Sequence, residues 1–206
     1  MIKARLTSQG PRSPRQSMPD ALQRIFQATA SKVKQGLILK ASVLYTRIGR
    51  LLAIADEAKL YLLEFLDRAN LERGIERLSL LANACIEPGI AKPLAQIEAE
   101  LKKYLEGNLS AFKTPISFYG TPFQIKVWRE LLKIPFGRTR SYSDIARAIG
   151  KPTAYRAVAQ ANGANRLAII IPCHRVIEAT GSLGGYSGGI AHKQDLLVHE
   201  NKASLR

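Results

Sequence analysis

Cysteine and histidine are scarce in this chain of 206 residues, and their positions exclude several kinds of site. The two cysteines, Cys85 and Cys173, are too few for a disulfide framework, so we expect a reduced, intracellular compartment, the cytoplasm. All three histidines lie in the last 33 residues. Residues 1–172 therefore hold one cysteine and no histidine, which is too little for a tetrahedral structural zinc site.

Long hydrophobic runs and nucleotide-binding signatures are also missing. No uncharged stretch approaches the length of a membrane span, and the beginning of the chain has no apolar segment of the kind found in secretory signals. The glycine patterns typical of phosphate loops and dinucleotide folds are absent. We therefore expect no cofactor, no metal and no membrane partner.

Acidic residues are few, and the excess of basic residues is unevenly distributed. Residues 1–36 carry 7 basic and 1 acidic side chain, residues 37–110 carry 10 of each, and residues 111–206 carry 14 and 5. Basic charge concentrated in one part of a chain is typical of proteins that bind polyanions such as DNA. A merely basic, well-solvated surface would give the same counts.

The composition divides the chain into three parts. Residues 1–36 form a basic segment whose Gly, Pro, Arg and Ser content over residues 10–17 predicts flexibility, with the start of a short helix at Asp20–Phe26. An organellar transit peptide has a similar composition, but we favour a basic tail that adds nonspecific DNA affinity. Residues 37–112 are expected to form a scaffold domain, and residues 113–206 a second domain that carries the chemistry.

Apolar periodicity predicts the elements of both domains. In the first, we expect a strand pair over residues 37–45 and 48–55, a strand over 59–65, and helices over 71–84 and 90–105. In the second, helices are expected over 123–134, 141–149, 153–161 and 190–200.

Two of these helices have the spacing of a helix-turn-helix unit. Ser141 and Asp144 are placed as a capping box at the start of one helix, and a turn at 150–152 leads to the next. The arrangement puts Tyr142, Arg156 and several basic residues in one short stretch. An ordinary helical hairpin would show the same pattern.

The segment Ile171-Pro172-Cys173-His174-Arg175-Val176 carries the strongest chemical signal. A cysteine and a histidine follow an apolar run, and Pro172 prevents that run from continuing as an interior strand. The cysteine is thus placed where a buried segment ends and the backbone turns, which suits a reactive thiol. An inert buried cysteine is the alternative.

With Asn165 before it and Gly-Gly-Tyr-Ser-Gly-Gly over residues 184–189 after it, this segment resembles the active-site region of the methylated-DNA–protein-cysteine methyltransferases, also called O6-alkylguanine-DNA alkyltransferases. The resemblance is strongest over residues 118–200. It implies an α+β fold, in which a small N-terminal ribonuclease-H-like α/β domain precedes a mostly helical, winged helix-turn-helix-like DNA-binding and active-site domain.

The resemblance also implies an activity, the direct reversal of DNA alkylation damage by a monomer acting on double-stranded DNA. O6-alkylguanine is flipped out of the duplex, and its alkyl group is transferred irreversibly to the protein in a single turnover. Whether O4-alkylthymine is also repaired stays open.

The family's site residues map onto this chain one by one. Cys173 is the nucleophile, His174 takes its proton through a water, and Glu200 orients His174. Tyr142 assists the departing guanine, and Asn165 ties the preceding turn to the cysteine segment. The residues implied in substrate binding are Tyr186, Ser187, Val176 and Lys193. Those implied in DNA binding are Arg156, which fills the gap in the stack, with Tyr142, Ser143, Lys151 and Ala157. We expect Cys85 to be a core residue and His192 a surface residue, neither with a role.

Two other functions fit parts of the pattern. One is a helix-turn-helix DNA-binding protein whose cysteine is inert. The other is a thiol hydrolase using Cys173, His174 and Glu200, although that function gives no reason for a basic helix-turn-helix unit.

Overall fold

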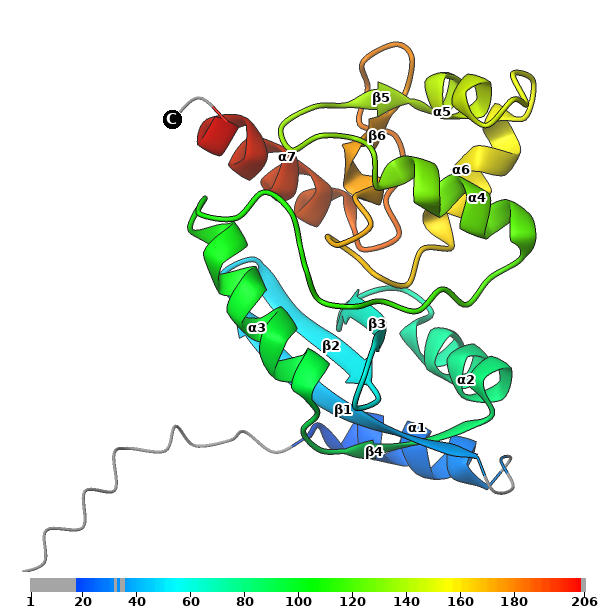
Figure 1. Ribbon diagram of the computed structural model, residues 1–206, viewed down its shortest axis with the longest axis vertical. Coiled ribbons are helices and arrows are strands. Elements are labelled where there is room, and N and C mark those ends of the chain that lie inside the picture. Colours follow the sequence, from blue (N-terminus) through cyan, green and yellow to red (C-terminus); the bar gives the residue numbers. More distant parts are fainter. Residues whose placement is uncertain (1–17, 32, 34–35, 205–206) are drawn as a thin grey trace, which may run out of the picture.

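A four-stranded mixed sheet forms the centre of the N-terminal half in the computed structural model, which describes residues 18–31, 33 and 36–204 (Figure 1). The strand order is β3-β2-β1-β4, with β1 antiparallel to β2 and parallel to β4, and with β2 antiparallel to β3. The strands are β1 Leu37–Thr46, β2 Gly49–Ala55, β3 Leu60–Phe65 and β4 Ala84–Pro88. The predicted strand pair and the third strand are confirmed.

The β1–β2 hairpin closes through a two-residue loop, Arg47-Ile48, between the paired residues Thr46 and Gly49. Gly49 has a φ of 124°, a conformation that costs little only for glycine. The Thr46 hydroxyl donates a hydrogen bond to the Gly49 carbonyl at 2.7 Å. These two residues therefore fix the register of the pair.

Alternate side chains of the sheet belong to two different hydrophobic cores. Leu51, Ala53 and Ala55 of β2 pack into one core, and Leu52 and Ile54 pack into the other, because successive strand side chains point to opposite faces. Helices α1 Asp20–Ala30 and α2 Leu71–Ala82 cover one face, whereas α3 Lys92–Leu105 and the C-terminal half cover the other (Figure 1).

The described part of the N-terminal segment is a packed helix rather than a flexible tail. Leu22 and Phe26 of α1 are 5% and 3% exposed and lie in the same core as Leu39 of β1. The helix predicted to start at Asp20–Phe26 is thus present. Because its apolar face is buried in the domain core, the helix belongs to the folded domain and not to a flexible tail. Residues 1–17, 32 and 34–35 lie outside the described residues, so the flexibility predicted for residues 10–17 stays a prediction.

Strand β4 was not predicted: its first residue, Ala84, was assigned to the end of the preceding helix, and residues 85–88 were assigned to no element. Helix α2 ends at Ala82, where Asn83 adopts a left-handed conformation with φ 46°. The following residues pair with β1 in parallel, with Leu37 opposite Ala84. A strand whose partner is distant in the sequence leaves no local periodicity, so the prediction of a helix over 71–84 was wrong at its end.

The C-terminal half is mainly helical, and the α+β class is confirmed. Its helices are α4 Pro122–Leu131, α5 Tyr142–Ala148, α6 Tyr155–Gly163 and α7 Ile190–Ser204, and its one strand pair joins β5 Arg140–Ser141 to β6 Val176–Ile177. The predicted capping box is present: Ser141 Oγ accepts from the Asp144 amide at 3.1 Å, and Asp144 Oδ2 accepts from the Ser141 amide at 2.8 Å. Gly150, with φ 73°, ends α5 before the turn to α6.

The division at residues 112 and 113 stays a prediction, since the chain between α3 and α4 continues across it and contributes Ile116 to a bridge with Leu60 of β3. Among the helices that the structure describes, none combines the length and apolarity needed to cross a membrane.

Replacing Phe26 by alanine tests whether α1 belongs to the fold. The buried ring would leave a cavity, so the free energy of unfolding should fall by about 3–5 kcal/mol. Urea denaturation measures this loss, and the exposed neighbour Gln27→Ala serves as the control with little expected change. A loss below about 1 kcal/mol for Phe26→Ala would mean that α1 is dispensable for stability.

Candidate active site

Cys173 lies in a 3₁₀ turn, Cys173–Arg175, that directly follows the buried run 168–171. The backbone turns at the cysteine, as the sequence indicated, and the Arg175 amide closes the turn by donating to the Pro172 carbonyl at 3.0 Å. The run itself is not a strand, as expected, and Ile169 has a φ of 70°. The thiol is 2% exposed and therefore sits in close-packed surroundings.

Asn165 holds the cysteine segment from one side. Its Nδ2 donates to the Cys173 sulfur at 3.0 Å and to the Ile171 carbonyl at 3.0 Å. Its Oδ1 accepts from the Leu167 amide at 2.9 Å. One buried side chain thus fixes both the loop before the apolar run and the sulfur after it, in agreement with the position expected for Asn165.

Burial raises the pKa of the Cys173 thiol, because a thiolate loses its hydration there. The hydrogen bond from Asn165 opposes this effect, as do the charge of Arg68, the Tyr186 hydroxyl and the charge of Lys193. The sulfur is therefore a thiol at rest, surrounded by groups that favour the thiolate once a base removes the proton.

His174 is the base nearest in sequence, and it is fully buried. Its Nε2 lies 2.9 Å from Glu200 Oε1. Burial lowers the pKa of His174 despite the opposing effect of Glu200, so the ring is neutral and donates its Nε2 proton to the carboxylate. Nδ1 then carries the free lone pair, and it has no hydrogen-bond partner among the described residues. The expected contact between His174 and Glu200 is present.

Glu200 accepts hydrogen bonds from several groups besides His174, the one partner that was predicted from the sequence. Arg175 donates from Nε at 2.8 Å and from Nη2 at 2.8 Å, and the Tyr104 hydroxyl donates at 2.6 Å. The Gly137 amide adds one at 3.1 Å. Burial alone would raise the pKa of Glu200, but the hydrogen bonds from His174 and Arg175 hold it well below its usual range. The carboxylate is therefore charged throughout the physiological range.

Lys193 is a fully buried cation beside this group. Its Nζ donates to the Val176 carbonyl at 2.6 Å and to the Leu183 carbonyl. Burial lowers the pKa of Lys193 to about 8, against the opposing effects of the nearby Cys173 and Glu178. Lys193 thus ties helix α7 to the start of the glycine-rich loop, and the Val176 carbonyl keeps one lone pair for another donor.

The glycine-rich loop brings Tyr186 over the cysteine. The Tyr186 ring packs against the backbone of its own loop at Gly188. A Cβ atom at that position would lie only 2.8 Å from the ring. The Tyr186 hydroxyl is buried, and no hydrogen bond of normal geometry reaches it among the described residues. Burial and the nearby Cys173 raise the pKa of Tyr186 well above its usual value, so it stays a neutral hydroxyl facing the sulfur. Ser187 is partly buried in the same loop.

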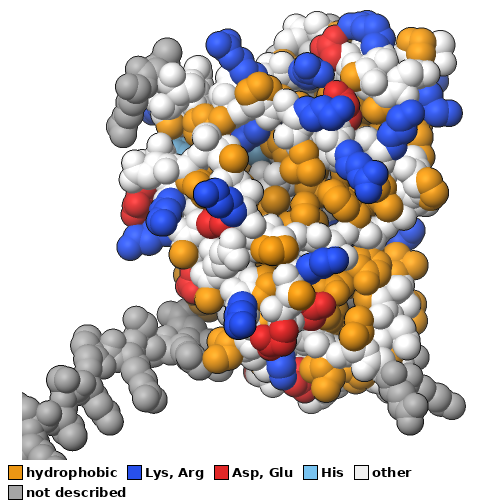
Figure 2. Space-filling model, in the orientation of Figure 1, with side chains coloured by type: hydrophobic (Ala, Val, Ile, Leu, Met, Phe, Trp, Pro, Cys, Tyr) orange, Lys and Arg blue, Asp and Glu red, His pale blue; other side chains and the backbone are white. Residues whose placement is uncertain are grey.

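The residues predicted to bind DNA lie on α5, on α6 and in the turn between them. Lys151, Arg156 and Ala157 are exposed, Ser143 is partly exposed, and the Arg156 guanidinium lies 5.7 Å from the centre of the Tyr155 ring. Tyr142 at the start of α5 is half-buried, and burial together with Cys173 and Glu178 raises its pKa. Figure 2 shows Lys and Arg side chains gathered over this part of the molecule, at the top right.

Comparison with known proteins gives a consistent result. A family model described as "6-O-methylguanine DNA methyltransferase, DNA binding domain" matches residues 122–202. A probable methylated-DNA–protein-cysteine methyltransferase of Acanthamoeba polyphaga mimivirus is 40% identical over 165 residues, which cover 80% of this chain and 98% of the relative. The chain belongs to the methylated-DNA–protein-cysteine methyltransferase family.

Other members match parts of the chain or its fold. The inducible methyltransferase of Bacillus subtilis is 52% identical over 105 residues, which span 51% of this chain and 59% of that relative. The crystal structure of Mycobacterium tuberculosis OGT in complex with DNA superposes with a TM-score of 0.68 at 37% identity, covering 81% of this chain and 94% of that chain. In the Bacillus subtilis relative and in a methyltransferase of Mycobacterium bovis, the match thus spans only about three fifths of their length.

Three side chains at this site were missed by sequence reasoning. Arg175 lies inside the cysteine motif but was given no role of its own. Tyr104 lies within the helix predicted over residues 90–105 and was not singled out. Arg68 lies in the loop after β3, far from the motif. The only available signal was their type, since a buried arginine or tyrosine needs a polar partner.

Arg68 connects the N-terminal half to the cysteine loop. Its guanidinium donates to the Asn165 carbonyl and to the Gly163 carbonyl, both at 2.9 Å, and forms an ion pair with Glu64. Burial and the charge of Arg166 lower the pKa of Arg68 to about 10, so it remains a cation at neutral pH. Its charge therefore favours the Cys173 thiolate.

Two residues expected to be uninvolved have different surroundings. His192 was expected at the surface, but its ring stacks on Phe65 with centroids 3.9 Å apart, and its Nε2 lies 3.0 Å from Asp67. It therefore joins the first turn of α7 to β3. Cys85 was expected in the core, but it is only partly buried on β4, since β4 lies at the edge of the sheet.

Replacing Glu200 by glutamine should slow the reaction of the Cys173 thiol by about tenfold or more at pH 7. Loss of the carboxylate lowers the basicity of His174 further, so less thiol is deprotonated; part of the rate should return as pH approaches the unperturbed thiol value of about 8.5. Alkylation rates from pH 6 to 9 measure this, with the exposed Glu98→Gln as control. An unchanged rate and pH profile would remove Glu200 from the proton path.

Because Arg175 is left buried without its partner in that variant, melting temperatures must be compared at the same pH. If the Glu200→Gln variant is fully folded at the assay temperature, its slower alkylation reflects lost reactivity of the thiol and not unfolding.

Replacing Arg68 by methionine should raise the pKa of Cys173 and slow thiol alkylation several-fold at pH 7. Both the positive charge and the ties to the Asn165 loop are lost. The pH dependence of iodoacetamide labelling measures the shift, and Arg50→Met, an exposed arginine on β2, is the matched control. If Arg68→Met loses stability but keeps the labelling profile, Arg68 is structural only.

Proposed function

We propose that this chain repairs alkylated DNA directly, by transferring the alkyl group from O6 of guanine to the sulfur of Cys173. The observation that carries the proposal is the arrangement around one sulfur: Asn165 donates to it, Tyr186 faces it, and the adjacent His174 is a neutral base held by Glu200. The same half of the chain carries a basic helix-turn-helix unit, and a similar protein's crystal structure is described as a complex with DNA.

Access to the sulfur requires that the damaged nucleotide leave the base stack, since a buried thiol cannot reach a base inside the duplex. In the proposal, α5 and α6 contact the DNA through Ser143, Lys151 and Ala157. The exposed Arg156 enters the stack and fills the gap left by the flipped base. The cost of unstacking is a few kcal/mol, which the inserted side chain offsets.

The chemical step is a single in-line displacement. His174 Nδ1, the free lone pair of the ring, takes the thiol proton through a water. The thiolate attacks the alkyl carbon, a C–S bond forms, and the C–O6 bond breaks with its electron pair passing to the guanine. Tyr142, half-buried and close to Cys173, donates a hydrogen bond to the purine as negative charge develops. The proton that His174 took from the thiol passes through water to the guanine, so His174 and Tyr142 both end neutral.

Guanine selectivity follows from the groups beside the sulfur. The remaining lone pair of the Val176 carbonyl accepts from the exocyclic amine, and Lys193 keeps that carbonyl in place. Ser187, in the loop that carries Tyr186, supplies a backbone donor for O6. These contacts favour the guanine edge over bases that lack its pattern of donors and acceptors.

The product is a thioether, which is stable, so each molecule repairs one lesion and is then spent. We propose further that the protein acts as a monomer in the cytoplasm and on O6-alkylguanine in double-stranded DNA. Support for the compartment comes from the two cysteines, both of which are free.

The test is the mass of the intact protein after mixing with a duplex that carries one O6-methylguanine. An increase of one methyl group on the Cys173 peptide, at a ratio of one per molecule, supports the proposal. A DNA-binding protein with an inert cysteine would bind the duplex without a mass change. A thiol hydrolase would instead turn over an activated ester repeatedly.

Replacing Cys173 by alanine should abolish the mass increase while leaving DNA affinity within about twofold. The sulfur is the acceptor, whereas binding depends on the exposed basic residues of α5 and α6. Fluorescence anisotropy with a labelled duplex measures affinity. A loss of affinity in proportion to the lost activity would contradict this division of roles.

Replacing Arg156 by alanine should slow repair in duplex DNA by about tenfold or more but leave the reaction with a free O6-alkylguanine base nearly unchanged. An inserted side chain matters only when a base must leave the stack. Single-turnover rates on both substrates measure the difference, with the exposed Arg24→Ala on α1 as control. Equal slowing on the two substrates would assign Arg156 to the chemistry instead.

A further inference from the structure

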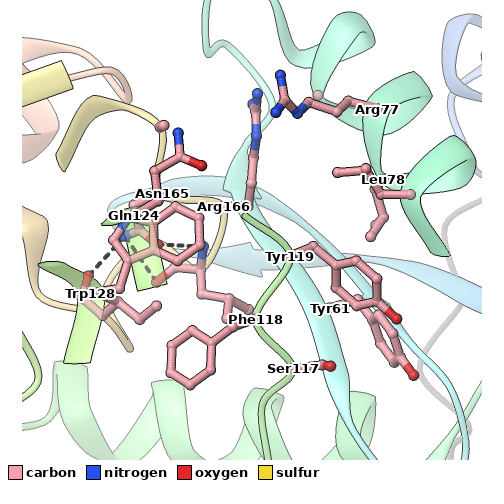
Figure 3. Close-up of a pocket in the computed structure, with 15 residues that line it drawn as sticks. Tyr61, Arg77, Leu78, Ser117, Phe118, Tyr119, Gln124, Trp128, Asn165 and Arg166 are labelled. Atoms are coloured by element: carbon pink, nitrogen blue, oxygen red, sulfur yellow. Dashed lines mark hydrogen bonds between the residues drawn. The ribbon is translucent and has the colours of Figure 1, made fainter. Parts of the chain in front are cut away.

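A crevice lies between the two halves of the molecule, and Asn165 and Arg166 are among the residues that line it (Figure 3). Helix α2 forms one wall, residues 117–119 and α4 form the other, and the loop that carries Asn165 and Arg166 closes one end. The cavity volume is about 70 Å³, and the crevice is partly open to solvent. None of the proposed catalytic steps uses this space.

Arg166 reaches across the crevice to α2. Added at Gly74 of α2, a Cβ would lie 2.5 Å from Arg166 Nη1, so the guanidinium packs directly on the glycine. In Figure 3 the guanidinium groups of Arg166 and Arg77 lie beside each other, and both residues line the crevice and the groove outside it. Two arginines from different halves of the chain therefore meet at one point.

The charges at this point are not balanced by carboxylates. Within the described residues, neither Arg77 nor Arg166 forms an ion pair or a side-chain hydrogen bond, and the outer groove also contains Arg73 with one carboxylate, Glu76. Like charges held together are unfavourable, and each guanidinium presents a fork of N–H donors. Burial and the charge of Arg77 lower the pKa of Arg166, as expected for cations without an anionic partner.

The groups around the two arginines indicate which kind of ligand fits this position. Beyond the arginines the walls are aromatic, with Phe118 stacked near Trp128 at 6.4 Å and Tyr61 near Tyr119 at 5.4 Å. Arg77 is exposed and Arg166 is partly buried, so an anion bound between them would keep part of its contact with water. Two planar forks that converge from different elements suit a group with several oxygens, for which phosphate is the best match.

We propose that Arg77 and Arg166 form a phosphate-binding site at the junction of the two halves. The phosphate comes either from a free phosphate or nucleotide, or from the backbone of the DNA strand that continues past α6. The second source rests on the proposed function, whereas the first does not. Because Arg166 directly follows Asn165, the site lies one residue from the side chain that holds the Cys173 sulfur.

Calorimetric titration of the full chain with inorganic phosphate and with deoxyguanosine monophosphate tests the free source. The DNA source is tested by the affinity of an undamaged duplex from 50 to 200 mM salt, a range over which phosphate contacts decide the slope. Each measurement is made on Arg77→Gln, Arg166→Gln and the control Lys103→Gln, which removes the same charge from the exposed side of α3.

A free-phosphate site predicts that affinity for phosphate or the nucleotide falls about tenfold or more in both arginine variants. A DNA site predicts that the duplex affinity falls and that the salt slope decreases by about one per arginine, without measurable binding of the free ligands. If both arginine variants match Lys103→Gln in both titrations, the proposal is wrong.

Gly74→Ala provides a second variant that keeps every charge. The added methyl would displace the end of the Arg166 side chain, and alanine favours the helix, so the fold should be retained. Loss of phosphate binding is expected, and retained binding would contradict the geometry. Alkyl transfer from a free O6-alkylguanine base to the unchanged protein is measured in parallel. If no transfer occurs, the proposed function is wrong, but the result for binding of free phosphate still stands.

Discussion

A buried carboxylate, Glu200, is the interaction on which the rest of the site depends. A charge removed from water is tolerated only when it is paired and hydrogen-bonded, and Glu200 meets this need with donors from α3, from the turn at Gly137 and from the 3₁₀ turn. Its helix, α7, is therefore positioned by polar contacts as much as by Leu196, its buried apolar residue. The orientation of His174 and the depth of Cys173 both follow from this arrangement.

Much of the fold was predictable because its elements carry local signals. Alternating apolar residues predicted β1 to β3, and the Ser141–Asp144 spacing predicted the start of α5. Strand β4 was missed, since a parallel strand is defined by its distant partner β1 and not by its own sequence. Helix α1 was predicted only as a short start within a flexible segment, for a related reason. Its apolar side chains stabilise the helix only when α2 and the sheet are present to bury them.

The site shows the same division between local and distant information. The motif around Cys173 predicted the His174–Glu200 contact and the place of Asn165, because a family resemblance carries those positions together. Tyr104 and Arg68 come from segments whose sequence has no chemical signature, and only the three-dimensional fold brings them within hydrogen-bond distance. The N-terminal half is thus more than a scaffold, since one of its cations is directed at the cysteine loop.

Strand β2 belongs to both hydrophobic cores, and this has a consequence for how the molecule comes apart. Leu51, Ala53 and Ala55 face the C-terminal half, while Leu52 and Ile54 face α1 and α2, and all five are fully buried. Opening either core would expose one side of the same strand and weaken its pairing with β1 and β3. The two halves therefore share one cooperative unit, because neither core can open without exposing apolar side chains of β2 to water.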